Sequence, residues 1–230
     1  MKPTIIYDDE NILILDKPSG MVVHPFDYST EYTVLDFLHE YYPSMFTINN
    51  AITLQDGRTI SLGGIVHKLD RETSGVMVIA KTQHIFDELQ SQFKNHTTKK
   101  KYTALVDGIL EKDSFTIDAP LGRSKKDYKQ STNPSNPRGE LRSAVTNVHI
   151  VKRNTYTTLV ELSPTTGRTH QLRAHMSSIN HPIVGDKAYG STIDSPRIRL
   201  HAQSISFTLN NKDYTFETPV PDDVTFETIK

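Results

Sequence analysis

The sequence predicts an α+β fold, built around a largely antiparallel or mixed sheet with few helices. Most of its apolar runs have the length and the flanking turn residues of strands. Only three segments space their apolar residues as a helix does. Pairs of adjoining strands at both ends of the chain have the pattern of hairpins, which favours an antiparallel or mixed sheet.

The first half of the chain begins with one of these hairpins, formed by TIIYD and NILILDK around acidic turn residues. A helix is predicted over TVLDFLHEYY (33–42), and residues 43–64 lack a consistent period and are predicted to be a long excursion. A buried strand follows at GVMVIAKT (75–82). Thr82 can then cap a helix over QHIFDELQSQFKNH (83–96), whose apolar residues form one stripe.

The second half is predicted to consist mainly of strands, at KYTALVDGIL (101–110), AVTNVHIV (144–151) and TYTTLVELS (155–163). In the third of these, Tyr156, Thr158, Val160 and Leu162 alternate toward one face. The segment LGRSKKDYKQSTNPSNPRGELRS (121–143) is rich in Pro, Ser, Asn and basic residues, so we predict an exposed loop. A late hairpin is predicted over LHAQSISFTL and YTFETP.

Length and composition allow one large domain or two small ones, since the chain has 230 residues and a mass of 26.0 kDa. No repeat or long linker divides it, so we predict a single domain over 1–230. The absence of cysteine excludes a disulfide framework, a thiol nucleophile and a thiolate metal site. Neither a signal peptide nor a membrane-spanning run is present in the sequence, so we expect a cytoplasmic monomer with no membrane partner.

Charge is distributed unevenly along a chain whose formal net charge is only −1. Residues 94–153 hold 13 Lys or Arg and 6 Asp or Glu, a net charge of +7, whereas residues 1–50 carry −6. The overall balance argues against a protein that binds nucleic acid through bulk charge. The basic segment is nevertheless compatible with a polyanion-binding face, as well as with an ordinary solvated surface.

An aspartate lies among cationic side chains in HKLDRETSG, residues 67–75. Asp70 follows His67 and Lys68 and precedes Arg71. Two interpretations fit this stretch: a salt-bridged turn at the start of a strand, or a site that needs an ionised carboxylate at a chosen place.

A second concentrated stretch is SPTTGRTHQLRAHMSSINHPIVGDKAYG, residues 163–190. Thr169 is the predicted N-cap of a helix that runs to about residue 179, with Leu172 and Met176 on its apolar face. A helix start that bears Arg168 and His170 suits an anion, because its first N–H groups lack partners. A plain amphipathic surface helix would also satisfy the pattern.

No metal site is predicted from the histidines. His170 and His175 are five residues apart, so they do not lie on one helical face as a metal-binding pair would. Taken alone, His67 is typical of a structural hydrogen-bonding residue. VGDKAYG around Asp186 has the pattern of a turn, and Lys99–Lys101 that of a solvated strand entry.

In combination, these segments resemble the RluA family of RNA pseudouridine synthases. The matching motifs occur in the family's order and are KPSGMVVHP (17–25), HKLDRETSGVMVIAK (67–81), KKYTALVDG (100–108) and ELSPTTGRTHQLRAHMSSINHPIVGDKAYG (161–190). LHAQSISF (200–207) resembles the segment that follows. The resemblance extends from about residue 5 to about residue 219. The motifs at 67–75 and 167–173 together are specific, whereas KPSG alone is a weak signal.

The resemblance implies a pseudouridine synthase fold, with a mixed, mainly antiparallel sheet in two halves and a central active-site cleft. It implies isomerisation of uridine in ribosomal or transfer RNA without a cofactor. By position, Asp70 matches the catalytic aspartate, Tyr102 the tyrosine that stacks on the target base, and Arg173 the arginine that pairs with the aspartate. Expected contacts with RNA come from His67, Lys68, Arg71, Arg168, His170, Gln171, Lys125, Lys126 and Lys129.

The chemistry accounts for these residue types. A base is detached and reattached without hydrolysis, so the carboxylate must be ionised and water kept out. Excluding water raises the pKa of a carboxyl group, and a neighbouring guanidinium offsets that rise. The target uridine must leave its stack, and an aromatic ring can replace the stacking that it loses.

Two departures from the family pattern concern RNA binding. Position 68 is Lys where many members have Arg, and a lysine cannot stack as a planar guanidinium does. The catalytic pattern begins almost at residue 5, so no N-terminal S4-type RNA-binding domain is expected and substrate choice would depend on the catalytic domain, including the basic segment 123–142.

Two other functions remain open. A nucleoside or glycoside hydrolase would use Asp70 as one of two carboxylates, with Asp186 as the best candidate for the second. A non-catalytic RNA-binding protein derived from a synthase is the other alternative, and the intact set of Asp70, Tyr102 and Arg173 argues against it.

Overall fold

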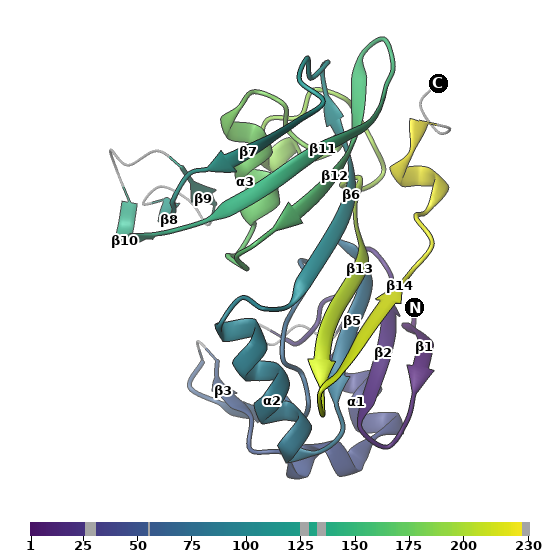
Figure 1. The fold of residues 1–230 in the computed structure, drawn as a ribbon. Coiled ribbons are helices and arrows are strands. Elements are labelled where there is room, and N and C mark those ends of the chain that lie inside the picture. Colours follow the sequence, from purple (N-terminus) through teal and green to yellow (C-terminus); the bar gives the residue numbers. More distant parts are fainter. Residues whose placement is uncertain (26–30, 55, 125–128, 133–136, 227–230) are drawn as a thin grey trace. The chain divides into compact units, whose positions relative to one another are not determined.

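Strands dominate the part of the chain that the structure, a computed structural model, describes: residues 1–25, 31–54, 56–124, 129–132 and 137–226. The predicted α+β class is confirmed. By its internal contacts the chain divides into two compact units (Figure 1). Unit 1 comprises residues 1–98 and 204–218, and unit 2 comprises residues 99–203 and 219–230.

The sheet of unit 1 has a buried strand, β5, at its centre. Across the sheet the order is β1 (Thr4–Asp8), β2 (Ile12–Lys17), β5 (Ser74–Ala80) and β13 (Leu200–Leu209), and β14 (Lys212–Glu217) pairs with β13. Residues 204–209 of β13 belong to this unit. Both predicted hairpins are confirmed as antiparallel pairs. β5 is buried over its whole length because both of its faces are apolar.

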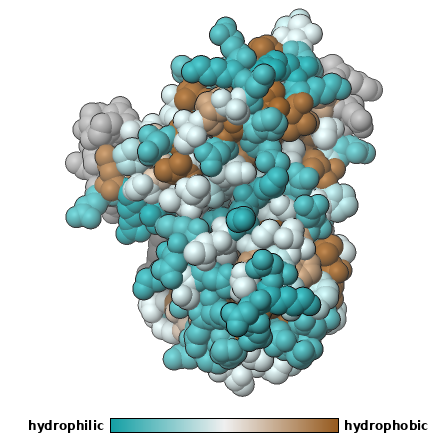
Figure 2. All heavy atoms as spheres, in the orientation of Figure 1, coloured by the Kyte–Doolittle hydropathy of each residue, from teal (hydrophilic) through white to brown (hydrophobic). Residues whose placement is uncertain are grey.

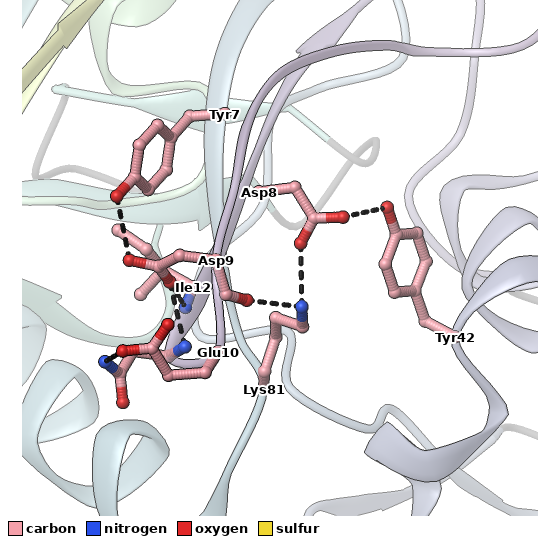
Figure 3. Close-up of polar contacts among 8 residues, drawn as sticks. Tyr7, Asp8, Asp9, Glu10, Ile12, Tyr42 and Lys81 are labelled. Atoms are coloured by element: carbon pink, nitrogen blue, oxygen red, sulfur yellow. Dashed lines mark hydrogen bonds and ion pairs between the residues drawn. The ribbon is translucent and has the colours of Figure 1, made fainter.

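Polar contacts close the end of the β1–β2 hairpin (Figure 3). The Asp8 carboxylate accepts hydrogen bonds from the Tyr42 hydroxyl at 2.8 Å and from Lys81 Nζ at 2.7 Å. Lys81 also donates to the backbone carbonyl of Asp9. The Asp9 side chain caps the turn by accepting hydrogen bonds from the backbone N–H groups of Asn11 and Ile12. Partial burial alone would raise the pKa of Asp9, but these hydrogen bonds outweigh it, and the pKa is lowered. Burial and the Asp8 carboxylate raise the pKa of Tyr42 to about 12.

Both predicted helices of unit 1 are present: the second begins at the predicted residue, and the first begins one residue after the predicted start. α1 (Val34–Tyr41) starts with a capping box between Thr33 and Asp36, and α2 (Gln83–Lys94) is capped by Thr82. The excursion between them contains η1 (Pro43–Thr47) and a short hairpin of β3 (Ala51–Thr53) and β4 (Thr59–Ser61). The surface over α2 and the β13–β14 turn is mainly hydrophilic (Figure 2).

Unit 2 is built on a second antiparallel arrangement. Its strands follow the order β13, β6 (Lys99–Asp107), β12 (Thr157–Pro164), β11 (Val145–Arg153) and β7 (Ser114–Asp118), and residues 200–203 of β13 belong here. α3 (Gln171–Ser178) packs Leu172 and Met176 into a core with Ala104 and Val160. Two short 3-10 helices complete the unit, η2 (Lys187–Tyr189) and η3 (Asp222–Val224).

Two predictions of local structure are wrong. The segment predicted as an exposed loop forms a three-stranded sheet in its described parts, with β8 (Leu121–Ser124), β9 (Gln130–Ser131) and β10 (Pro137–Arg142) in the order β10, β8, β9. These strands pair through their backbones and need no apolar alternation, so periodicity does not reveal them. We name residues 121–142 the basic excursion.

The start of α3 also differs from the prediction. The helix begins at Gln171, and His170 at its N-cap has φ 51° and no capping side chain. Thr169 therefore lies outside the helix. In the described segments, no helix combines the length and the apolar character needed to cross a membrane.

Candidate functional site

The loop that carries Asp70 starts from an anchored histidine in unit 1. His67 Nε2 accepts a hydrogen bond from the backbone N–H of Val78 in β5 at 3.1 Å. Its ring stacks on Phe93 of α2, with centroids 4.7 Å apart and planes 18° apart. His67 thus ties the start of the motif to a strand and a helix, and Lys68, the next residue, is exposed.

A buried lysine also supports the loop that carries Asp70. Lys17, at the end of β2, is 0% exposed, although lysines are almost never fully buried. Its ammonium donates to three backbone carbonyls, those of Pro18 at 3.0 Å, Met21 at 2.9 Å and Arg71 at 3.1 Å. Those bonds satisfy its three N–H donors and join residues 17–21 to the turn after Asp70.

Two further hydrogen bonds strengthen this junction. Ser19 Oγ donates to the carbonyl of Glu72 at 2.7 Å, and the N–H of Gly20 donates to the carbonyl of Arg71 at 2.9 Å. Gly20 has φ 84°, a left-handed conformation that glycine adopts without strain. The motif KPSG, a weak signal in the sequence, thus forms the support of the Asp70 loop.

Asp70 lies at a tight turn between the buried Leu69 and the buried strand β5. Its carbonyl accepts a hydrogen bond from the N–H of Thr73 at 3.1 Å, and its side chain is half-buried. Arg71 is exposed and pairs with Glu31 at 2.7 Å. The His67 side chain before Asp70 and backbone groups after it are thus hydrogen-bonded, which fixes the position of the backbone from which the Asp70 side chain extends.

Tyr102 and Lys100 belong to unit 2, two residues apart on β6 and so on one face of the strand. Tyr102 is half-buried against the core, opposite Leu162 of β12. Lys100 is also half-buried, and burial lowers the pKa of its ammonium group. The solvated strand entry that the sequence predicts therefore describes Lys99 and Lys101, which are exposed, and is wrong for Lys100.

The loop before α3 is held from within by an amide. Gln171 is 4% exposed and its Oε1 accepts hydrogen bonds from Thr166 Oγ1 at 2.7 Å and from the N–H of Arg168 at 3.0 Å. Its Nε2 donates to the carbonyl of Val145 at 3.0 Å and to Thr146 Oγ1 at 3.1 Å. Those four bonds use both N–H donors and both acceptor lone pairs of the amide, so Gln171 positions the loop that presents Arg168.

Arg173, for which the family resemblance implies a pair with Asp70, forms a buried ion pair with Asp186 within unit 2. Its Nε and Nη2 donate to the two carboxylate oxygens of Asp186, at 2.6 and 3.0 Å. The two side chains are 9% and 1% exposed. The Arg173 guanidinium carbon also lies 4.8 Å from the centroid of the Tyr189 ring. The buried Asp186 carboxylate is thus the partner of a guanidinium, whereas a hydrolase would need a second acid that solvent can reach.

The turn that supplies Asp186 is connected to the rest of the site. Asp186 caps η2 by accepting a hydrogen bond from the N–H of Tyr189 at 3.3 Å. The Tyr189 hydroxyl accepts from the N–H of Gln130 in β9 at 2.8 Å and is hydrogen-bonded to His170 Nδ1 at 3.0 Å. The spacing of Asp186 and Tyr189, three residues apart, is the one sequence signal of this cap.

Side chains proposed to contact RNA occur in both units. Arg168 is half-exposed and its Nε donates to the carbonyl of Ser143 at 3.1 Å. In the basic excursion, Arg123 and Arg142 are exposed and Lys129 is half-buried, whereas Lys125 and Lys126 lie outside the described residues. The structure brings Arg173, His170, Asp186 and Tyr189 together in unit 2, and it places Asp70 in unit 1.

Comparison with known proteins gives a consistent result. The sequence profile of the family described as RNA pseudouridylate synthase matches residues 11–178. The chain is 38% identical to the uncharacterized RNA pseudouridine synthase YlyB of Bacillus subtilis, over 96% of this chain and 70% of that protein. It is 36% identical to ribosomal large subunit pseudouridine synthase D of Nitrosomonas europaea, over 96% of this chain but 62% of that protein, so it spans less than two thirds of the latter.

A solved structure shares the fold. Human RNA pseudouridylate synthase domain containing 1 superposes with a TM-score of 0.75 at 23% identity, over 95% of this chain and 83% of that one. At that identity the likeness concerns the fold alone.

Proposed function

Because this chain belongs to the RNA pseudouridylate synthase family, whose members are isomerases that act on RNA, we propose that it converts uridine in ribosomal RNA to pseudouridine. The observation that carries the proposal is the family match over 11–178, which includes Asp70, Tyr102 and Arg173. Relatives named for the large ribosomal subunit support ribosomal RNA as the substrate. Transfer RNA is the alternative substrate.

The proposed reaction needs no cofactor. The bond between N1 of uracil and C1′ of ribose breaks, the base turns, and a bond forms between C5 and C1′. A proton leaves C5 and N1 acquires one, so the product is an isomer of the substrate. Asp70 acts as the carboxylate nucleophile or base in this sequence of steps.

Tyr102 and Arg173 are proposed to assist Asp70. The half-buried ring of Tyr102 stacks on the uracil that has left the RNA stack, and Arg173 favours the ionised form of the reacting carboxylate. Asp70 belongs to unit 1, whereas Tyr102 and Arg173 belong to unit 2, so the proposal requires residues of both units to act on one nucleotide.

The proposed RNA contacts fall into two groups by their geometry. Lys68, Arg71 and Arg168 have exposed or half-exposed cationic groups that suit phosphates, and Lys125, Lys126 and Lys129 of the basic excursion join them. His67 and Gln171 already hold backbone groups through their side chains, so we assign them to positioning the two loops. His170, half-buried beside Tyr189, remains a proposed contact.

The activity can be tested with transcripts that carry tritium at C5 of uridine. We expect the protein to release tritium into water from a large-subunit ribosomal RNA transcript, with the product nucleoside keeping the mass of uridine apart from the label. Small-subunit ribosomal RNA and transfer RNA transcripts serve as comparison substrates. Release of free uracil with an abasic site would indicate a hydrolase, and RNA binding without tritium release a binding protein.

The assignment of Asp70 predicts that Asp70→Asn abolishes tritium release. The change removes the carboxylate but keeps the size of the side chain, so the fold and the affinity for RNA should remain close to those of the unchanged protein. Glu72→Gln, which neutralises a carboxylate two residues away, is the matched control and should retain activity. Turnover by Asp70→Asn, in a preparation free of the unchanged enzyme, would overturn the assignment.

A further inference from the structure

The turn from Asp186 to Tyr189 holds the Arg173 side chain on two sides. The Asp186 carboxylate accepts from Nε at 2.6 Å and from Nη2 at 3.0 Å, so it fixes one edge of the planar guanidinium. The Tyr189 ring covers a face of the same group at 4.8 Å. With an edge and a face both fixed, the plane and the rotation of the guanidinium are determined.

The turn is itself held in place by contacts around it. Asp186 accepts from the N–H of Tyr189, and Ser177 Oγ of α3 donates to the Tyr189 carbonyl at 2.7 Å. Gly185 has φ 82°, and a Cβ at that position would lie 2.3 Å from the carbonyl oxygen of Arg197. Only glycine fits there, so the backbone that leads into Asp186 packs closely against the backbone of Arg197.

Stability alone does not account for such a pair. Removing a guanidinium and a carboxylate from water costs free energy, and apolar residues of similar volume often serve a protein interior as well or better. The arrangement therefore suits a group that must be both ionised and oriented.

We propose that Asp186 is a positioning residue for the isomerisation, which holds the Arg173 guanidinium in the orientation in which it acts on the reacting carboxylate. The inference rests on the proposed function, because it gives Asp186 an effect on the reaction only through Arg173. Asp186 does not touch the substrate in this scheme.

A double-mutant cycle tests the proposal. Single-turnover tritium release is measured for the unchanged protein, Asp186→Asn, Arg173→Met and the double variant. We expect Asp186→Asn to lower the rate by about 100-fold, the cost of a misplaced reacting group, with little change in the affinity for the transcript. In the Arg173→Met background the same substitution should change the rate little, because the residue through which it acts is gone.

Asp194→Asn is the matched control. Asp194 pairs with Lys187 of the same turn at 2.8 Å, but both side chains of that pair are largely exposed, at 75% for Lys187 and 86% for Asp194. We expect this variant to keep the rate of the unchanged protein. A loss equal to that of Asp186→Asn would show that the rate responds to any lost charge near η2 and would overturn the proposal.

An orientation signal independent of activity completes the test. In the unchanged protein the Nε–H of Arg173 should exchange slowly with solvent in ¹⁵N-resolved NMR spectra, and in Asp186→Asn it should exchange faster. Should Asp186→Asn fail to fold, the comparison of Arg173→Met with the double variant still decides, since equal rates support the proposal and unequal rates overturn it.

Other outcomes overturn the inference or its basis separately. Full activity of Asp186→Asn, or an equal fold-loss in both backgrounds, contradicts a role through Arg173. An active Asp70→Asn variant, or a protein that releases no tritium from any transcript, instead contradicts the proposed function on which the inference rests.

Discussion

Two buried cations, one in each unit, are engaged by fixed acceptors. Lys17 donates to three backbone carbonyls beneath the Asp70 loop, and Arg173 donates to the Asp186 carboxylate. Their acceptors differ in charge, and the difference suggests different roles. A lysine surrounded by carbonyls fixes the course of the backbone, whereas an arginine held by a carboxylate has its own orientation fixed.

Lys17→Met should destabilise the protein by about 3 kcal/mol or more, because three backbone carbonyls, one buried and two partly buried, would each lose a donor. The free energy of unfolding in urea measures this loss. Lys2→Met is the control, since Lys2 is an exposed lysine of the same unit, and it should change stability little. Equal losses in the two variants would contradict the role assigned to Lys17.

Arg173→Ala should lower the rate of pseudouridine formation by about 100-fold or more. The pH at which the rate is half-maximal should also rise, because the variant lacks the cation that is proposed to favour the ionised form of the reacting carboxylate. Rates measured over a series from about pH 5 to about pH 9, on both sides of neutral pH, give this midpoint. Lys101→Ala removes an exposed cation of the same unit and should leave the midpoint in place. An unchanged midpoint in Arg173→Ala would assign Arg173 to packing or RNA binding.

At the scale of elements, the sequence predicts well what is decided locally. The start of α2 follows from Thr82 and an apolar stripe, and both are encoded within a few residues. The start of α3 is set instead by Gln171, whose amide joins Thr166 and Val145, so contacts distant in sequence override the capping signal at Thr169. For the same reason the pair of Arg173 and Asp186, thirteen residues apart, could not be recognised from spacing.

His175 makes the stability of α3 dependent on pH. The side chain is 0% exposed, Nδ1 is hydrogen-bonded to Thr146 Oγ1 at 2.8 Å and Nε2 to the carbonyl of Ala119 at 2.9 Å. Burial lowers its pKa below the usual 6.5, so an unfolded chain takes up the proton first as the pH falls. The full stability is therefore present above about pH 6.5 and is lost progressively below it.

We expect the stability of the unchanged protein to fall more steeply between pH 7.5 and pH 5 than that of His175→Gln, about the pH range in which an unfolded histidine titrates. Urea unfolding at each pH measures the difference. His149→Gln replaces an exposed histidine of β11 and should keep the slope of the unchanged protein. If His175→Gln shows that same slope, His175 does not carry the effect.

At the scale of the whole molecule, an almost neutral protein must bind a polyanion through a local concentration of charge. The basic excursion lies within the +7 segment, and its described parts form a sheet of their own, which Tyr189 joins to η2 through the N–H of Gln130. A folded support for these cations is compatible with contact to phosphates. The described parts of the excursion thus form a small structural element, where composition predicts a loop.

Neutralising Lys125, Lys126 and Lys129 to Gln should weaken RNA binding, with little change in turnover at saturating RNA. Each lost phosphate contact reduces the slope of log affinity against log salt concentration by about 0.9 for a duplex, so the triple variant should lose about 2 to 3 units. Filter binding across a salt series measures both quantities. Lys112→Gln with Lys152→Gln alters exposed lysines of unit 2 outside the excursion and is the control. Unchanged affinity and slope in the triple variant would show that the excursion does not contact the RNA.

The way in which β13 is divided between the units has a consequence for synthesis on the ribosome. Unit 1 receives residues 204–218 only after the whole of 99–203 has been translated. At the usual elongation rate, β5 therefore waits about 6 to 25 s for the strand that covers one of its edges. An apolar strand with an open edge is prone to pair with other chains, so the nascent protein passes through an interval in which protection by a chaperone would matter most.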